Sequence, residues 1–240
     1  MRRTAIRRAA LVACLALAAC QGQDPAAAEA GRVQAREQAA EEAARGFDAA
    51  VSAGEWELAR AHGDVLLADF PGTAAAERIK PRHAEIVARA EASEAARRLE
   101  SLWSYQSVPV EGGEQRSASI RAREDVDVDG SGPSPVQLIF RDHPDWGRSS
   151  YLVLRTGDFD CRGGCDVQVT VDDGPARAMD ASRPDTDDAI AMFIEDEAAL
   201  WKLAADAGTI AIEFPVAAGG TRTAVFEVGG LDPTRLPGWT

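Results

Sequence analysis

The residue types that support catalysis are sparse in this chain. Its 240 residues contain three histidines, His62, His83 and His143. The sequence holds no serine-nucleophile elbow, no His-Glu-x-x-His pair and no glycine-rich phosphate-binding loop. His143 stands in Asp142-His143-Pro144-Asp145, where an acid–base group or a metal ligand could form. Such a polar, proline-containing segment is more typical of a solvated loop, so we predict a loop and name no catalytic residue.

Three alternating aspartates, Asp125, Asp127 and Asp129, could begin a calcium-binding loop, because alternate carboxylates before a glycine wrap a hard cation. The twelfth position of such a loop requires a bidentate glutamate, and here it is Val136. An exposed strand that runs into a turn explains the same residues, so the aspartates are only weak metal candidates. We expect a solvated loop around a second acidic patch, which comprises Asp180, Asp185, Asp187 and Asp188.

Two cysteines, Cys161 and Cys165, flank a pair of glycines. In an oxidising compartment such a pair predicts a disulfide, and the glycines give the short loop the backbone freedom that it needs. Because the loop is small, we expect a stabilisation of about 2 kcal/mol. The alternatives are a redox-active pair, which is usually Cys-x-x-Cys at a helix start, and a metal site, which would need nearby histidines.

The N-terminus has the layout of an export signal. Four arginines precede an apolar run, residues 9–19, that is too short to span a bilayer as a helix. The run ends in Leu17-Ala18-Ala19-Cys20, which resembles the lipobox of bacterial lipoproteins. The resemblance implies that residues 1–19 are removed and that Cys20 carries acyl chains such as palmitate. Gln21 follows in place of an aspartate, which implies an outer-membrane destination facing the periplasm.

The chain is acidic. Its formal net charge is −13, and removal of the signal, with its four arginines and no acidic residue, takes the charge to −17. Phosphate binding requires a basic surface, so this charge argues against a nucleic-acid partner and against broad adhesion to anionic lipid. We therefore expect membrane contact through the lipid on Cys20. The acidic residues are spread along the chain, which favours a role in solubility.

The N-terminal half is predicted to be helical after a short tether, residues 20–31. Alanine, glutamate and arginine dominate residues 32–103. We predict one helix that ends before Gly54, a second from Trp56 to Phe70, and a third from Thr73 to about residue 103, kinked or restarted at Pro81. Residues 40–75 resemble one tetratricopeptide repeat. Because one repeat cannot bury its own face, this hairpin is either a partner-binding groove or a spacer packed on itself or on the next domain.

The second half, residues 104–240, is predicted to be β-rich. Alternating apolar and polar side chains predict strands at 136–140, 151–154, 167–171, 210–214 and 224–228. A helix is expected from Glu195 to Ala207, ended by Gly208. The predicted fold class is α+β: an N-terminal helical hairpin or three-helix segment, then an antiparallel sheet or sandwich of about seven to nine strands with one helix.

This second half also resembles a domain of uncharacterised bacterial envelope proteins. The resemblance covers about 130 residues. Its motifs are an aromatic-led strand at 103–105, Gly-x-Phe-x-Cys at 157–161, Cys-x-Val-x-Val with Asp-Asp-Gly at 165–174, Phe-Ile at 193–194, Ile-x-Ile-Glu at 210–213 and Phe-x-Val-x-Gly-Leu at 226–231. Val171 stands where these proteins usually have phenylalanine. The resemblance implies a fold and no catalytic residue. A weaker resemblance is to envelope accessory proteins of secretion systems.

Together these features predict an outer-membrane-anchored periplasmic lipoprotein that binds or recruits a partner, such as an envelope protein, without catalysis and without a cofactor. One alternative is a periplasmic enzyme with a carboxylate-based site, because acid pairs form only when the chain folds. A cation-binding module and a secretion-system accessory protein are also compatible with the sequence.

Overall fold

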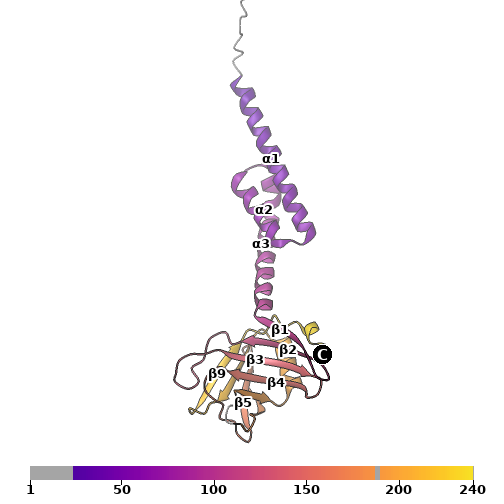
Figure 1. The fold of residues 1–240 in the computed structure, drawn as a ribbon. Helices are drawn as coiled ribbons and strands as arrows, with labels where there is room; N and C mark the ends of the chain where they lie inside the picture. Colours follow the sequence, from indigo (N-terminus) through magenta and orange to yellow (C-terminus); the bar gives the residue numbers. More distant parts are fainter. Residues whose placement is uncertain (1–23, 187–189, 240) are drawn as a thin grey trace, which may run out of the picture. The chain divides into compact units, whose positions relative to one another are not determined.

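The computed structural model describes residues 24–186 and 190–239 and has the predicted α+β class, with helices preceding an antiparallel sheet (Figure 1). The chain divides into two compact units, and the boundary between them falls between Ile86 and Val87. This point lies inside the third helix. The boundary expected from composition, between residues 103 and 104, therefore falls within the second unit.

Helix α1 (Pro25–Ala53) begins earlier than the composition predicts, so the expected tether is wrong from Pro25 onward. A proline in the first turn loses no helical hydrogen bond, and the Asp24 side chain accepts a hydrogen bond from the Ala26 N–H at 3.0 Å. Gly54 ends the helix with a φ of 73°, which glycine adopts without strain. The predicted lipidation site, Cys20, lies outside the described residues.

Helices α2 (Trp56–Asp69) and α3 (Ala74–Ser101) follow. Thr73 fixes the start of α3, because its hydroxyl accepts a hydrogen bond from the Ala76 N–H at 3.3 Å and donates one to the Phe70 carbonyl at 2.8 Å. Pro81 lies inside α3, and the helix continues through it, so the restart considered for this proline does not occur.

The first unit has a small core in which alanines allow the helices to approach closely. Phe47 from α1, Leu66 from α2 and Ile79 from α3 are fully buried. The alanines buried around them are Ala40, Ala44, Ala50, Ala59, Ala75 and Ala76. Arg78 also pairs with Glu41 at 2.8 Å, but both side chains are about half exposed, so the pair contributes little stability. The stability of this unit therefore depends on a few large side chains.

In the second unit the described strands form one antiparallel sheet in the order β1-β2-β3-β4-β7-β6-β5-β8-β9 (Figure 1). Helix α4 (Glu197–Asp206) follows β7, close to its predicted bounds, and a short 3-10 helix, η1 (Pro233–Arg235), follows β9. The strands are β1 (Trp103–Val110), β2 (Gly113–Arg121), β3 (Val136–His143), β4 (Gly147–Leu154), β5 (Cys165–Val171), β6 (Arg177–Ser182), β7 (Ala191–Ile194), β8 (Ile210–Pro215) and β9 (Thr221–Phe226).

The sheet curls around a single core. Buried residues from both ends of the sheet, such as Ile120 of β2 and Phe226 of β9, belong to one cluster together with Trp201 of α4. Only a twisted and curved sheet brings such distant strands to one core. Trp103 of β1 donates a hydrogen bond from Nε1 to the Val228 carbonyl, just after β9, at 3.3 Å. Alternate side chains of each strand therefore pack into the core, and the side chains between them face outward.

Candidate binding face

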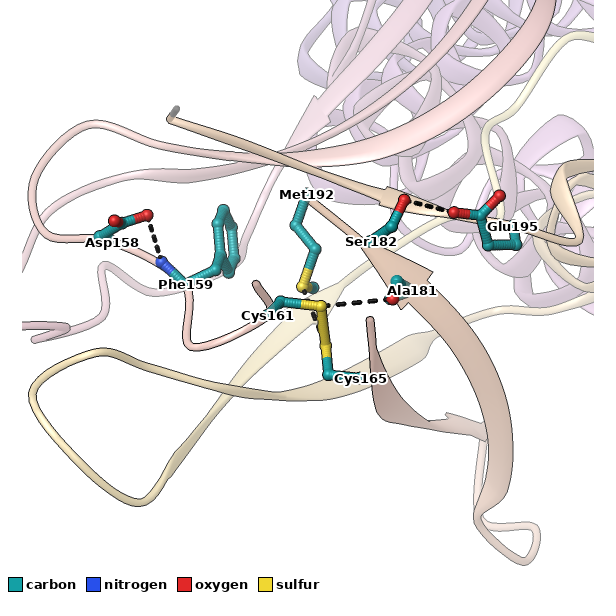
Figure 2. Close-up of a disulfide and its surroundings, with 8 residues drawn as sticks. All are labelled: Asp158, Phe159, Cys161, Cys165, Ala181, Ser182, Met192 and Glu195. Atoms are coloured by element: carbon teal, nitrogen blue, oxygen red, sulfur yellow. Dashed lines mark hydrogen bonds between the residues drawn. A yellow bond between two sulfur atoms is a disulfide. The ribbon is translucent and has the colours of Figure 1, made fainter. Parts of the chain in front are cut away.

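Cys161 and Cys165 form a disulfide with an S–S distance of 2.06 Å. Cys165 is the first residue of β5, and its sulfur lies 3.8 Å from the Met192 sulfur of β7 (Figure 2). Cys161 is fully buried, and its sulfur lies 3.3 Å from the Ala181 carbonyl oxygen of β6 (Figure 2). The disulfide therefore lies against three neighbouring strands and closes the loop that leads into β5.

His143 is not on a solvated loop, so that prediction is wrong. It is the last residue of β3 and is only 6% exposed, because the turn to β4 places the Trp146 ring on it, with the ring centroids 4.0 Å apart. Its Nδ1 accepts a hydrogen bond from the Asp145 N–H at 3.1 Å. His62 and His83 lie on α2 and α3. The structure therefore does not gather the three histidines in one site of the β unit.

The weak metal candidates stabilise a turn. The Asp127 carboxylate accepts a hydrogen bond from the Gly130 N–H at 2.7 Å, and the Asp129 carboxylate accepts one from the Ser131 N–H at 2.9 Å. Hydrogen bonds from Ser131 hold the pKa of the Asp129 carboxyl below its ordinary value. Asp125 is exposed. Among residues 24–186 and 190–239, no group of three or more His, Cys, Asp or Glu side chains is placed to hold a metal ion.

The second acidic patch is only partly described. Asp180 is an exposed residue of β6, and Asp185 pairs with Arg162 at 3.0 Å. Asp187 and Asp188 lie outside the described residues.

The outward side chains of β1–β4 form a surface that we name the polar face. Strand register arranges them in rows: Ser104 lies opposite Ser119, Ser119 opposite Ile139, and Ile139 opposite Tyr151. Neighbouring strands are about 4.8 Å apart, so each row presents side chains at that regular spacing. The polar face comprises Ser104, Gln106, Val108, Gln115, Ser117, Ser119, Arg121, Gln137, Ile139, Arg141, Ser149, Tyr151 and Val153.

A groove with a volume of about 660 Å³ lies over the polar face. Ser104, Ser117, Ser119 and other serine and glutamine side chains line it. Their hydroxyl and amide groups can both donate and accept hydrogen bonds. The volume is within the usual range for small-molecule sites, about 300–1,000 Å³. The groove is therefore large enough for a ligand of several rings and is suited to a polar one.

A stack of three side chains adjoins the groove. The Arg141 guanidinium lies 5.4 Å from the ring centroid of Trp146 and 5.4 Å from that of Tyr151, which itself lines the groove. Trp146 is 71% exposed. Burial raises the pKa of the Tyr151 hydroxyl, and the nearby Arg141 charge opposes this shift. The hydroxyl therefore stays protonated near neutral pH and remains available as a donor.

Two buried polar atoms beside this stack have no hydrogen-bond partner among the described residues. They are the Arg141 Nε and the Ser149 Oγ, which belong to residues that lie opposite each other on β3 and β4. Buried polar groups are normally satisfied, and an exception commonly marks a bound water or ligand. Both atoms are enclosed by neighbouring groups and do not reach the surface of the polar face.

Charge separates the polar face from the rest of the outward surface. Arg121 and Arg123 line the groove. The only carboxylate among the described residues that line it, that of Glu227, accepts hydrogen bonds from two nitrogens of Arg98, at 2.8 and 3.2 Å. Arg98 holds the pKa of Glu227 below its ordinary value. The outward positions of β5, β6 and β8 are instead acidic, with Asp166, Asp180 and Glu213.

The polar face was not predicted from the sequence. The sequence pattern that could have indicated it is the alternation of serine and glutamine with other residues. These residues stand at 104 and 106 on β1 and at 115, 117 and 119 on β2. Comparisons with protein-family models, with curated proteins and with solved structures found no match to this chain.

Within the part of the chain that the structure describes, every helix is too short or too polar to cross a lipid bilayer.

Proposed function

We propose that this protein is a lipoprotein of the outer membrane, anchored through Cys20 and facing the periplasm, that binds a component of the cell envelope without catalysing a reaction. The lipobox-like Leu17-Ala18-Ala19-Cys20 supports the anchor. The groove of about 660 Å³ over the polar face supports the binding role and is the observation that carries it.

The polar face is suited to binding because its side chains are positioned before a ligand arrives. They project from paired strands whose opposite side chains, such as Leu138 and Leu152, are fully buried. A rigid support of this kind reduces the conformational entropy lost on association. Tyr151 and Trp146 add aromatic surface, which is enriched at the centres of binding sites.

The anchor is tested by growing expressing cells with an alkyne analogue of palmitate and measuring its incorporation into the chain. We expect label in the wild-type protein and in the outer-membrane fraction. We expect no label with Cys20→Ala, because the acylated sulfur is lost. Unlabelled wild-type protein would show that Cys20 is not a lipidation site.

The binding role is tested by photo-crosslinking in intact cells. A photoreactive residue replaces Ser119 on the polar face or, as a matched control, Thr170, an outward residue of β5 with similar exposure. We expect a reproducible adduct from position 119 and none from position 170. Equal adducts from both positions, or none from position 119, would contradict a binding role for this face.

A further inference from the structure

We infer that the ligand of the polar face is an acidic glycan, a chain of sugars that carry carboxylates. This inference rests on the proposed function, because it names the ligand class for the same groove. Three features of the described residues carry it: the neutral groups that line the groove, the arginines beside them, and the aromatic rings next to these arginines.

The neutral side chains match the hydrogen bonding of sugars. A sugar hydroxyl both donates and accepts, and so do the hydroxyls of Ser104, Ser117 and Ser119 and the amides of Gln106 and Gln137. Within each row, the side chains of neighbouring strands lie about 4.8 Å apart. An extended glycan laid across β1–β4 would therefore meet a side chain from each successive strand, with the serine hydroxyls on β1 and β2 and the Tyr151 ring on β4.

The arginines supply charge complementarity. Arg121 and Arg123 line the groove, and the Arg123 charge helps to lower the pKa of the Glu227 carboxyl, although the protein as a whole has a formal charge of −13. Other arginines of the β unit are engaged, as in the pairs Arg116–Glu114 at 2.7 Å and Arg183–Asp158 at 2.9 Å. A guanidinium binds a carboxylate with two parallel hydrogen bonds. The positive charges of Arg121 and Arg123 at the groove therefore favour an anionic ligand.

The aromatic stack supplies a second form of recognition. Trp146 is 71% exposed, and its ring lies against His143 on one side and near Arg141. An exposed, supported ring offers a flat apolar surface for the C–H groups of a sugar. The Arg141 guanidinium, 5.4 Å from the ring centroids of Trp146 and Tyr151, adds a cation beside this ring.

The same surface is a poor match for a protein partner. Stable protein interfaces usually have an apolar centre, whereas the large apolar side chains that line this groove are few: Leu102, Ile120, Ile139 and Tyr151. Backbone groups between β1, β2, β3 and β4 are used in the strand ladders, so an extended peptide laid over the groove would meet side chains, and strand addition would have to use the outer edge of β1 instead. Charge and hydrogen bonding therefore favour the glycan.

The inference is tested by isothermal titration calorimetry of the full, lipidated chain in mild detergent. The probes are hexagalacturonate, which has a carboxylate on every sugar, the neutral maltohexaose, and the acidic peptide hexaglutamate. We expect hexagalacturonate to bind with a dissociation constant below about 1 mM, and we expect this binding to weaken as the salt concentration is raised. Maltohexaose and hexaglutamate should each bind at least about tenfold more weakly.

Two variants locate the interaction. Arg121→Gln/Arg123→Gln should weaken hexagalacturonate binding by at least about tenfold, because two charge-assisted contacts are lost. Arg177→Gln is the control, since Arg177 is an exposed arginine of β6 that does not line the groove. Thermal melts confirm that both variants fold. Equal loss in the two variants would overturn the assignment of the groove.

The remaining outcomes separate this inference from the proposed function. If hexagalacturonate fails to bind, or if hexaglutamate or maltohexaose binds as tightly, the acidic-glycan inference is wrong. A crosslinked adduct at position 119 in intact cells would still support binding by the polar face. Absence of that adduct, together with no binding of any probe, would reject both.

Discussion

The helical unit packs three helices around alanines and a single phenylalanine, whereas the β unit surrounds a cluster of aromatic rings with a curled sheet. In the first unit Phe47 is the one large ring of the fully buried core among the described residues. In the second, Phe140 lies 5.1 to 6.2 Å, between ring centroids, from Trp103, Trp201 and Trp239. The larger and more aromatic core therefore lies beneath the polar face, where it supports the binding surface.

The strongest test of this comparison is Phe140→Ala. Phe140 is fully buried among three tryptophans, so its removal should leave a cavity and lower the free energy of unfolding by about 3–5 kcal/mol. Urea denaturation followed by near-ultraviolet circular dichroism measures the loss. Val108→Ala, at a side chain that is 43% exposed, should change stability far less. Similar losses in the two variants would contradict the aromatic core.

The matching change in the helical unit is Phe47→Ala. Phe47 is fully buried, with the Arg82 guanidinium 5.4 Å from its ring centroid, but its smaller neighbours should partly close the cavity. We expect a loss of about 3 kcal/mol, seen as earlier melting of the helical far-ultraviolet signal. Val65→Ala, at a side chain that is 52% exposed, is the control. A loss larger than that of Phe140→Ala would reverse the comparison between the units.

Removing the disulfide should have a moderate effect on the β unit. Cys161→Ala/Cys165→Ala opens a loop of four residue steps, so the unfolded chain gains little entropy and the expected loss is about 2 kcal/mol. Differential scanning calorimetry measures the fall in melting temperature. Treatment of the wild-type protein with reductant should reproduce it. An unchanged melting temperature in both cases would show that the disulfide adds nothing to the packing of β5, β6 and β7.

The smallest expected effect is that of the Arg98–Glu227 pair, in which Arg98 is exposed and Glu227 is half-buried. Arg98 lowers the pKa of Glu227 below its ordinary 4.5, so the carboxylate stabilises the folded state above that pH. This stabilisation is lost as the pH falls through the lowered pKa. Glu227→Gln should therefore be less stable than the wild type near neutral pH, and the difference should shrink in acid. A difference that does not change with pH would show that the pair has no electrostatic role.

Local signals in the sequence predicted much of the fold. Alternating apolar residues identified β5 and β8, and Gly54 marked the end of α1. The start of α1 was missed, because alanines after a proline suit both a tether and a helix until the Asp24 cap is seen. Strands β2 and β6 carry few β-branched or aromatic residues, so their alternation is weak.

The candidate site was harder to predict, because it exists only through strand pairing. Ser104, Ser119 and Tyr151 are distant in the sequence and come together through the register of four strands. His143 was wrongly expected on a solvated loop, since its burial depends on how the turn places Trp146. Disulfide spacing, in contrast, is local, and Cys161 and Cys165 were expected as a pair from the sequence.

The alternation along β1–β4 has an evolutionary consequence. Inward residues such as Leu138 and Leu152 are buried, while their outward neighbours take almost no part in the core. Mutations at outward positions can therefore accumulate at little cost in stability, which lets ligand preference drift while the scaffold is retained. The same separation makes the polar face suitable for a randomised library in which new specificities are selected.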